Sequence, residues 1–199
     1  YFYMYERIAI APCRRERYAT LGELLRRPDN RWPGFAPEID EWEQKRALPT
    51  VLRTPSRPIR ADLWELLQRQ GDLHEMPHER KLAYNSLFAN LKRIGQLSSA
   101  IKRAESRLQI LRYPADISTS DRRRYYDELS EADSLSALVE FIVESSLRMI
   151  EEFELATYTE DQRLEVQDYA AEMRLFHARR FPGCPVKFEM PLLEDTATR

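Results

Sequence analysis

The chain has 199 residues, of which 32% are charged and 11% aromatic, a composition typical of one globular domain with its own core. Its net charge of -2 gives no general attraction for nucleic acid. Its five glycines are too far apart for a phosphate-binding loop and its two cysteines are too few for a zinc ribbon, while no apolar run reaches the roughly 18 residues that cross a bilayer.

The first predicted element is a helix over residues 1–27, which Pro12 should kink or interrupt. It begins with YFYMY, four aromatic residues in five, followed by Glu6 and Arg7. Aromatic residues collect where a membrane helix meets the lipid headgroups, so this start fits the end of a membrane helix that precedes Tyr1. It fits an ordinary buried helix start equally well, and these residues alone leave both interpretations open. The predicted apolar stripe comprises Phe2, Tyr5, Ile8, Cys13, Tyr18, Leu21 and Leu25.

Residues 28–60 are predicted to form an irregular, mostly extended excursion, because six of the twelve prolines lie there. Trp32 and Trp42 suggest that this excursion packs on the helices. A short helix, ADLWELLQRQ, follows over residues 61–70, with Gly71 in the C-cap position.

Three longer helices complete the predicted fold. The clearest runs from about Pro77 to Leu111, where apolar residues recur every three or four positions. STSD (118–121) offers caps for a second long helix that reaches about Phe153, and TEDQ (159–162) is a capping box for a last helix that ends at FPGCP. Residues 61–181 would form the bundle core and residues 182–199 a tail. The fold class is therefore all-α, an antiparallel bundle of about four main helices. The predicted inward residues are Tyr84, Leu87, Leu91, Ile94, Leu97, Ile101, Ala104, Leu108 and Leu111 in the first of these helices, Leu129, Ala132, Leu135, Leu138, Ile142, Met149 and Phe153 in the second, and Val166, Tyr169, Met173 and Phe176 in the last.

HEMPH, residues 74–78, has the spelling of the HExxH zinc-protease motif. That motif works because one continuous helix places both histidines on the same face, with the glutamate as general base. Here Pro77 disfavours helix at the residue before it, so a helix that starts at Pro77 leaves His74 outside. A third ligand would also be needed, and His177 is the only other histidine. We expect no metal and no cofactor, with His78 solvated in the first turn of its helix.

Other chemistries find little support. A di-iron bundle needs two Glu-x-x-His pairs, whereas Glu75 to His78 is the only one. Serines are plentiful, but GxSxG is absent and each histidine has a surface explanation, so a serine hydrolase stays only an alternative. CRRER (13–17), RRRYY (122–126) and EEFE (151–154) are interpreted as solvated helix faces or ends rather than as nucleic-acid contacts.

Residues 54–94 resemble a loose group of uncharacterised bacterial proteins that begin with one transmembrane helix and continue into a helical domain. The shared pattern is an extended Pro-x-Arg-Pro lead-in, a short Trp-containing helix, a Gly before a Met-Pro turn, and a long helix that bears a Tyr. The matching residues are Pro55, Arg57, Pro58, Trp64, Gly71, Met76, Pro77, Arg80 and Tyr84. A weaker match continues through ELSEADSLSALVEFI to about Leu155, so about half of the chain is covered. The group often has His before Met-Pro, whereas this chain has Glu75 there and His74 one place earlier.

The resemblance implies location and architecture but no chemistry, because no activity is established for the group as a whole. We therefore expect a membrane helix before Tyr1, with the domain in the periplasm of a bacterium and the cytoplasmic face as the less favoured side. The leading hypothesis is a non-enzymatic helical interaction or sensory module, with a protein partner or self-association and no nucleic acid. The alternative is a hydrolase that uses an unrecognised serine or a metal site near His74 and His78.

Two structural expectations accompany this hypothesis. Trp64, Met76 and Tyr84 should form a knot, next to Gly71 and Pro77, that docks the excursion onto the long helix. Cys13 and Cys184 should form a disulfide in an oxidising periplasm. Four helices of alternating direction would bring the two ends of the chain to the same side of the bundle and so permit this bond.

Overall fold

The computed structural model describes residues 2–28, 31–34, 65–66, 69, 76–156 and 159–180. These residues form four α-helices, and a 3-10 turn, η2 (Leu108–Arg112), extends the second of them. Two strands of two residues each pair antiparallel, with Arg31 opposite Asp116 and Trp32 opposite Ala115. The prediction of an all-α bundle is confirmed. The elements are α1 (Phe2–Arg26), β1 (Arg31–Trp32), α4 (His78–Arg107), β2 (Ala115–Asp116), α5 (Thr119–Glu152) and α6 (Glu160–Arg180).

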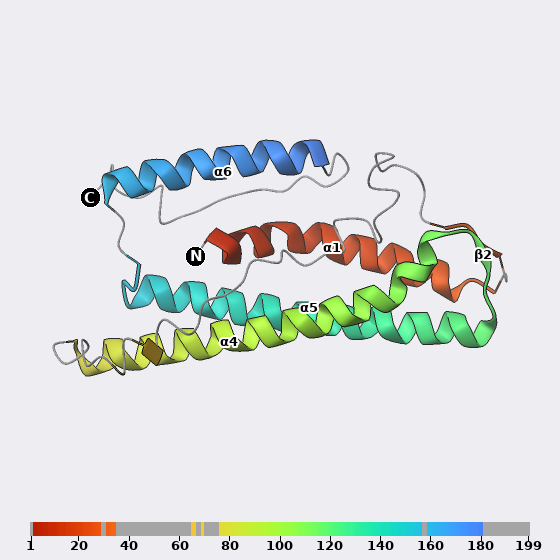
Figure 1. The fold of residues 1–199 in the computed structure, drawn as a ribbon, viewed down its shortest axis with the longest axis horizontal. Helices are drawn as coiled ribbons and strands as arrows, with labels where there is room; N and C mark the ends of the chain where they lie inside the picture. Colours follow the sequence, from red (N-terminus) through yellow and green to blue (C-terminus); the bar gives the residue numbers. More distant parts are fainter. Residues whose placement is uncertain are drawn as a thin grey trace.

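The helices lie side by side along the length of the molecule, and α5 packs against both α1 and α4 (Figure 1). Helix α1 is antiparallel to α5, since Arg26 reaches Tyr126 near one end and Tyr5 donates to Glu151, 3.1 Å away, near the other. Helix α4 is also antiparallel to α5, so α1 and α4 are parallel to each other (Figure 1). The expected alternation of all four helices is therefore wrong. The roughly 50 residues between α1 and α4 are long enough to return along a helix of about 37 Å.

The apolar core follows the predicted stripe of α4 closely. Every predicted inward position from Tyr84 to Leu111 is buried or half-buried, and Ile94, Ile101, Leu108 and Leu111 are fully enclosed. The prediction that Phe153 and Phe176 are buried is wrong, because their side chains are 37% and 44% exposed. Phe153 comes just after the last residue of α5, where the inward stripe of the helix ends. In α6 the inward face is Val166, Ala170, Met173 and His177, spaced by four, three and four residues, and Phe176 lies to one side of it.

The helix ends match their sequence signals. Pro77 takes an extended conformation (φ -53°, ψ 143°) immediately before α4, as expected for a residue that breaks helix on its N-terminal side. The Ser118 hydroxyl accepts from the Asp121 N–H at the start of α5. Thr159 and Gln162 form the predicted capping box, each backbone N–H donating to the other side chain at 3.0 and 3.3 Å.

Helix α1 runs through Pro12 without interruption, so the expected break at this residue is wrong, while the expected kink stays a prediction. The Pro12 ring is exposed, so the helix loses one backbone hydrogen bond while its buried face remains intact. At the start of α1, Met4 is buried and Tyr3 and Tyr5 are half-buried against the bundle. Among the described residues, no helix combines the length and apolar character needed to span a membrane.

Only the beginning of the Pro-rich excursion is described. Trp32 is completely buried, and its indole N–H donates to the Leu111 carbonyl, so this part packs on the bundle. In the predicted short helix, Glu65, Leu66 and Arg69 are helical. Trp42, Trp64, Gly71, His74, Glu75, Cys184 and the tail 182–199 lie outside the described residues.

Candidate functional site

The HEMPH segment is described from Met76 onward. His78 is exposed in the first turn of α4, and Pro77 before it is extended rather than helical. His74 and Glu75 lie outside the described residues. Within the described part of the chain, no group of three or more His, Cys, Asp or Glu side chains is arranged to hold a metal ion.

The start of α4 holds the end of α5. The Tyr84 hydroxyl donates to the Leu155 carbonyl at 2.9 Å, and Arg80 donates to the Glu154 carbonyl at 2.9 Å. Glu154 has a left-handed backbone (φ 48°), so these contacts fix the turn that ends α5. Met76, which directly precedes Pro77, is half-buried. The proposed knot also needs Trp64, which lies outside the described residues, so the knot stays a prediction.

Cys13 is buried on α1 and is disulfide-bonded. A bond within this chain of two cysteines would join it to Cys184, which lies outside the described residues. The pairing of these two residues stays a prediction.

The main concentration of buried charge lies on α1, where the sequence predicted a solvated face. Arg14 is 1% exposed and donates through Nη2 to Glu140 of α5, which also accepts from the exposed Arg15. Glu140 itself is 6% exposed. Partial burial of Asp133 raises the pKa of that carboxyl above its ordinary value, and the negative charge of Glu140 acts in the same direction. The interpretation of CRRER as a solvated face is therefore wrong for Arg14, because that residue continues the inward stripe of α1.

Arg7 has weaker hydrogen bonding than Arg14. It is 0% exposed, and its Nη1 donates to the Tyr3 hydroxyl at 3.4 Å, a long contact. Its Nε and Nη2 atoms have no hydrogen-bond partner among the described residues, and the same holds for Nε and Nη1 of Arg14. Burial lowers the pKa of Arg7, and the positive charge of Arg14 acts in the same direction. The two arginines lie seven residues apart on one face of α1, and Glu140 accepts from Arg14, whereas Arg7 donates to the Tyr3 hydroxyl.

Two further buried pairs connect α1 to other helices. The Tyr18 hydroxyl donates to Glu105 of α4 at 3.0 Å, and burial, reinforced by that carboxylate, raises the pKa of Tyr18. His177 Nε2 lies 3.3 Å from Oε1 of Glu6, and both side chains are buried between α6 and α1. The surface explanation for His177 is therefore wrong, because His177 falls on the inward face of α6.

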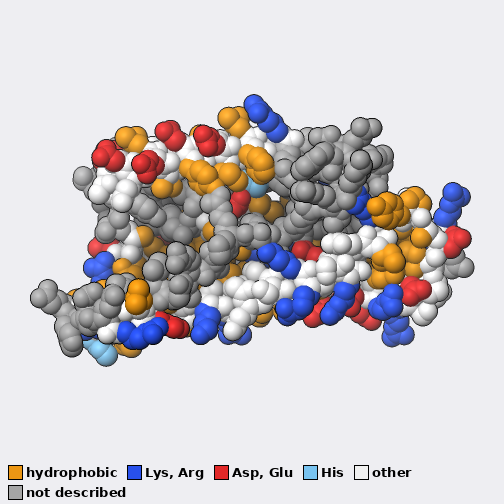
Figure 2. Space-filling model, viewed as in Figure 1, with side chains coloured by type: hydrophobic (Ala, Val, Ile, Leu, Met, Phe, Trp, Pro, Cys, Tyr) orange, Lys and Arg blue, Asp and Glu red, His pale blue; other side chains and the backbone are white. Residues whose placement is uncertain are grey.

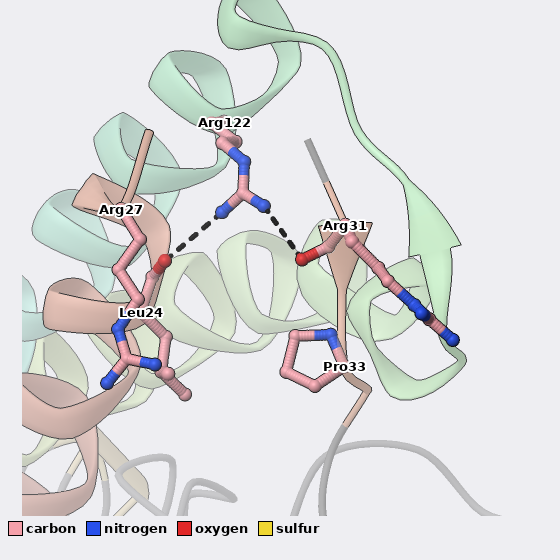
Figure 3. Close-up of a pocket in the computed structure, with 5 residues that line it drawn as sticks. All are labelled: Leu24, Arg27, Arg31, Pro33 and Arg122. Carbon is pink, nitrogen blue, oxygen red and sulfur yellow. Dashed lines mark hydrogen bonds between the residues drawn. The ribbon is translucent and has the colours of Figure 1, made fainter. Parts of the chain in front are cut away.

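One pocket in the described part of the chain lies where α1 ends (Figure 3). It has a volume of about 230 Å³ and is lined by Leu24, Arg27, Arg31, Pro33 and Arg122. Arg122, from the first turn of α5, is 5% exposed and donates to the carbonyls of Leu24 and Arg31 at 3.1 and 3.2 Å. The interpretation of RRRYY as a solvated face is thus wrong for Arg122, which ties β1 to the end of α1.

No protein-family model matches the chain, and neither a curated protein nor a solved structure is significantly similar to it.

Proposed function

We propose that the chain is a membrane-tethered helical module that acts by interaction or sensing rather than by catalysis. A membrane helix would precede α1, and the domain would lie on the periplasmic side of a bacterial inner membrane. The resemblance of residues 54–94 to bacterial proteins with that organisation supports the tether. The disulfide at Cys13 supports an oxidising location.

The observation that carries the proposal is the incomplete bonding of buried charge on α1. Arg7 and Arg14 face the bundle rather than the solvent, and both keep donors without a hydrogen-bond partner among the described residues. Burying a charge without full compensation costs several kcal/mol. That cost reduces the free-energy gap between this packing of α1 and a shifted packing of the same helix. A helix poised between two packings is the kind of element that sensory proteins use.

The surface of α6 supports the interaction part of the proposal. Leu164, Leu175 and Phe176 are 53%, 61% and 44% exposed, and acidic side chains lie among the hydrophobic ones over this helix (Figure 2). Exposed large apolar side chains that gather on one helix are typical of a surface that meets another protein. The partner would be another protein or a second copy of the chain.

The hydrolase alternative gains no support from the described residues. His78 is exposed at the start of α4, and the described pocket lies beside β1, next to no histidine. Its other proposed residue, His74, lies outside the described residues.

Two labelling experiments test the proposal in cells that make the protein with its native upstream sequence. Gln96 is exposed on α4, so Gln96→Cys should react with a membrane-impermeant maleimide in intact spheroplasts and should sediment with membranes. Labelling that needs lysis, or a soluble protein, would refute the tether and the location.

The second experiment places a photo-crosslinking amino acid at Leu175, with Gln96 as the matched exposed control. We expect a discrete cross-linked protein from Leu175 and none from Gln96. Equal or absent cross-linking at the two positions would refute α6 as an interaction surface.

A further inference from the structure

Helix α6 carries apolar side chains on the face opposite to its inward one. Leu164 and Leu175 lie on this outer face and are 53% and 61% exposed, and the exposed Ala171 lies between them. Leu164, Asp168, Ala171 and Leu175 are spaced by four, three and four residues, which is the spacing along which two helices pack. We call these four residues the outer seam. The solvent face of a helix is ordinarily polar, so two large exposed leucines there indicate a site for a further helix.

Four acidic residues form a line that crosses the outer seam at Asp168. Asp161, Glu165, Asp168 and Glu172 are also spaced by four, three and four residues, and all four side chains are exposed. Figure 2 shows acidic side chains interleaved with hydrophobic ones over α6. Like charges three or four residues apart destabilise a helix, and a cationic partner removes that repulsion. This surface therefore complements a partner that is both apolar and basic.

A second copy of α6 does not meet this requirement. A parallel pair joined along the outer seam would place Glu160 of one copy against Glu165 of the other. An antiparallel pair that brings Leu164 to Leu175 would place Glu165 against Glu172. Like charges that face each other oppose association, so both pairings are disfavoured.

We infer that α6 binds a basic amphipathic helix of another protein. Apolar residues of that helix pack against Leu164 and Leu175, while its lysine or arginine side chains pair with Glu165 and Glu172 beside the outer seam. The inference rests on the proposed interaction surface of α6 and specifies its partner.

The first test measures binding of two synthetic peptides to the purified chain by fluorescence anisotropy. One peptide is an amphipathic helix of about five turns, with leucines at the seam spacing and lysines beside them. The other has glutamate in place of every lysine. The basic peptide should bind, more weakly as salt is added, and the acidic peptide should not.

Charge reversal on α6 provides the sharper comparison. In the Glu165→Lys/Glu172→Lys variant the affinity for the basic peptide should fall by about tenfold or more, because attraction becomes repulsion. The matched control is Glu131→Lys/Glu144→Lys on α5, which replaces two exposed glutamates and changes the net charge equally. The reversals on α6 also relieve repulsion within that helix, so the variant should fold, which circular dichroism would verify.

The apolar part of the surface has its own variant pair. Leu175→Gln should weaken binding of the basic peptide several-fold, whereas Leu82→Gln, which replaces a 52% exposed leucine of α4, should not. Equal binding of the two peptides would overturn the inference. Equal losses of affinity in the two charge-reversal variants, or in the two leucine variants, would overturn it as well.

The second test maps the segment that cross-links to Leu175 in cells by mass spectrometry of the joined peptides. That segment should contain more lysine and arginine than aspartate and glutamate, and Glu165→Lys/Glu172→Lys should abolish the cross-link. A neutral or acidic segment, or a second copy of the chain, would overturn the basic partner but leave α6 an interaction surface. The absence of any cross-link would refute that surface and this inference with it. The peptide assay depends on neither the tether nor the location, so those parts of the proposed function can fail separately.

Discussion

Replacing Arg7 with methionine should stabilise the protein, whereas replacing Glu140 with glutamine should destabilise it. Glu140 accepts from Arg14 and Arg15, so its neutralisation leaves Arg14 buried without the carboxylate that accepts its hydrogen bond. Breaking a buried ion pair in this way costs about 3–5 kcal/mol. Arg7 is fully buried with two donor atoms unpartnered among the described residues, and an apolar side chain of similar length removes that cost. Replacing buried charge by packed hydrophobic groups gains about 1–4 kcal/mol.

The melting temperature measures both effects. In a domain of this size 1 kcal/mol corresponds to about 2–4 °C, so Glu140→Gln should lower the melting temperature by about 6–20 °C and Arg7→Met should raise it by at least about 2 °C. Arg15→Gln is the control: Arg15 shares the same carboxylate but is 57% exposed, so its loss should cost less than about 1 kcal/mol. Circular dichroism at 222 nm would follow the helices during heating. If Arg7→Met melted as early as Glu140→Gln, Arg7 would be well compensated and the reasoning about α1 would be wrong.

Three further predictions concern other sites. Gly34 has φ 78° and an added Cβ would meet neighbouring atoms at 3.0 Å, so Gly34→Ala should lower the free energy of unfolding by about 1–3 kcal/mol. An added Cβ at Gly95 would meet no atom within 4 Å, so Gly95→Ala should raise the free energy of unfolding by about 0.5–1 kcal/mol. Urea unfolding of both variants measures the two changes. The pKa of Asp133 is raised in the folded state, so the ionised carboxylate destabilises the fold at a pH above that pKa. This destabilisation disappears once the pH falls below the ordinary value of 3.8, because the carboxyl is then protonated in both states. Asp133→Asn should therefore raise the melting temperature at pH 7 but not at pH 3. A thiol assay of unfolded, unreduced protein should find no free thiol if Cys13 and Cys184 are joined, a bond that closes about 170 residues and contributes about 5 kcal/mol, whereas two free thiols per chain would exclude it.

The sequence predicted the helices well, because their signals are local. The stripe of α4 and the caps at Ser118 and Thr159 depend on residues within one or two turns of each other. The direction of α1 relative to α4 could not be predicted in the same way, since it depends on a connection of roughly 50 residues whose path no local pattern specifies. The expectation of alternating helices failed for that reason.

The buried charges were missed because each charged residue was assigned to the solvent by its type. Their spacing along the helix predicts their burial better than their residue type does. Arg7 and Arg14 precede Tyr18, Leu21 and Leu25 at spacings of seven, four, three and four, so the same stripe that contains the apolar residues also contains the two arginines. The pocket gave no such signal, because Arg27, Arg31 and Arg122 come together only through the pairing of β1 and the return of α5.

The interface of α5 with α1 contains a buried ion pair, whereas its interface with α4 is centred on apolar side chains. Against α4, α5 presents residues such as Val139 and Val143, which pack with Ile94 and Ile101 in one apolar cluster. Such close-packed interfaces resist sliding, because every displacement opens voids. Against α1, α5 also packs apolar residues, with Leu21 and Leu25 beside Leu129 in one cluster. Only this interface also encloses a buried ion pair, in which Glu140 accepts from Arg14 while Arg14 retains donors without a partner among the described residues. Hydrogen bonds of that kind can be exchanged for others when a helix shifts, so α1 has a local means of adjusting against α5 that the apolar contacts with α4 do not offer. A displacement of α1 would then be transmitted to Arg122 at the start of α5, since the last turn of α1 supplies the Leu24 carbonyl that accepts from Arg122.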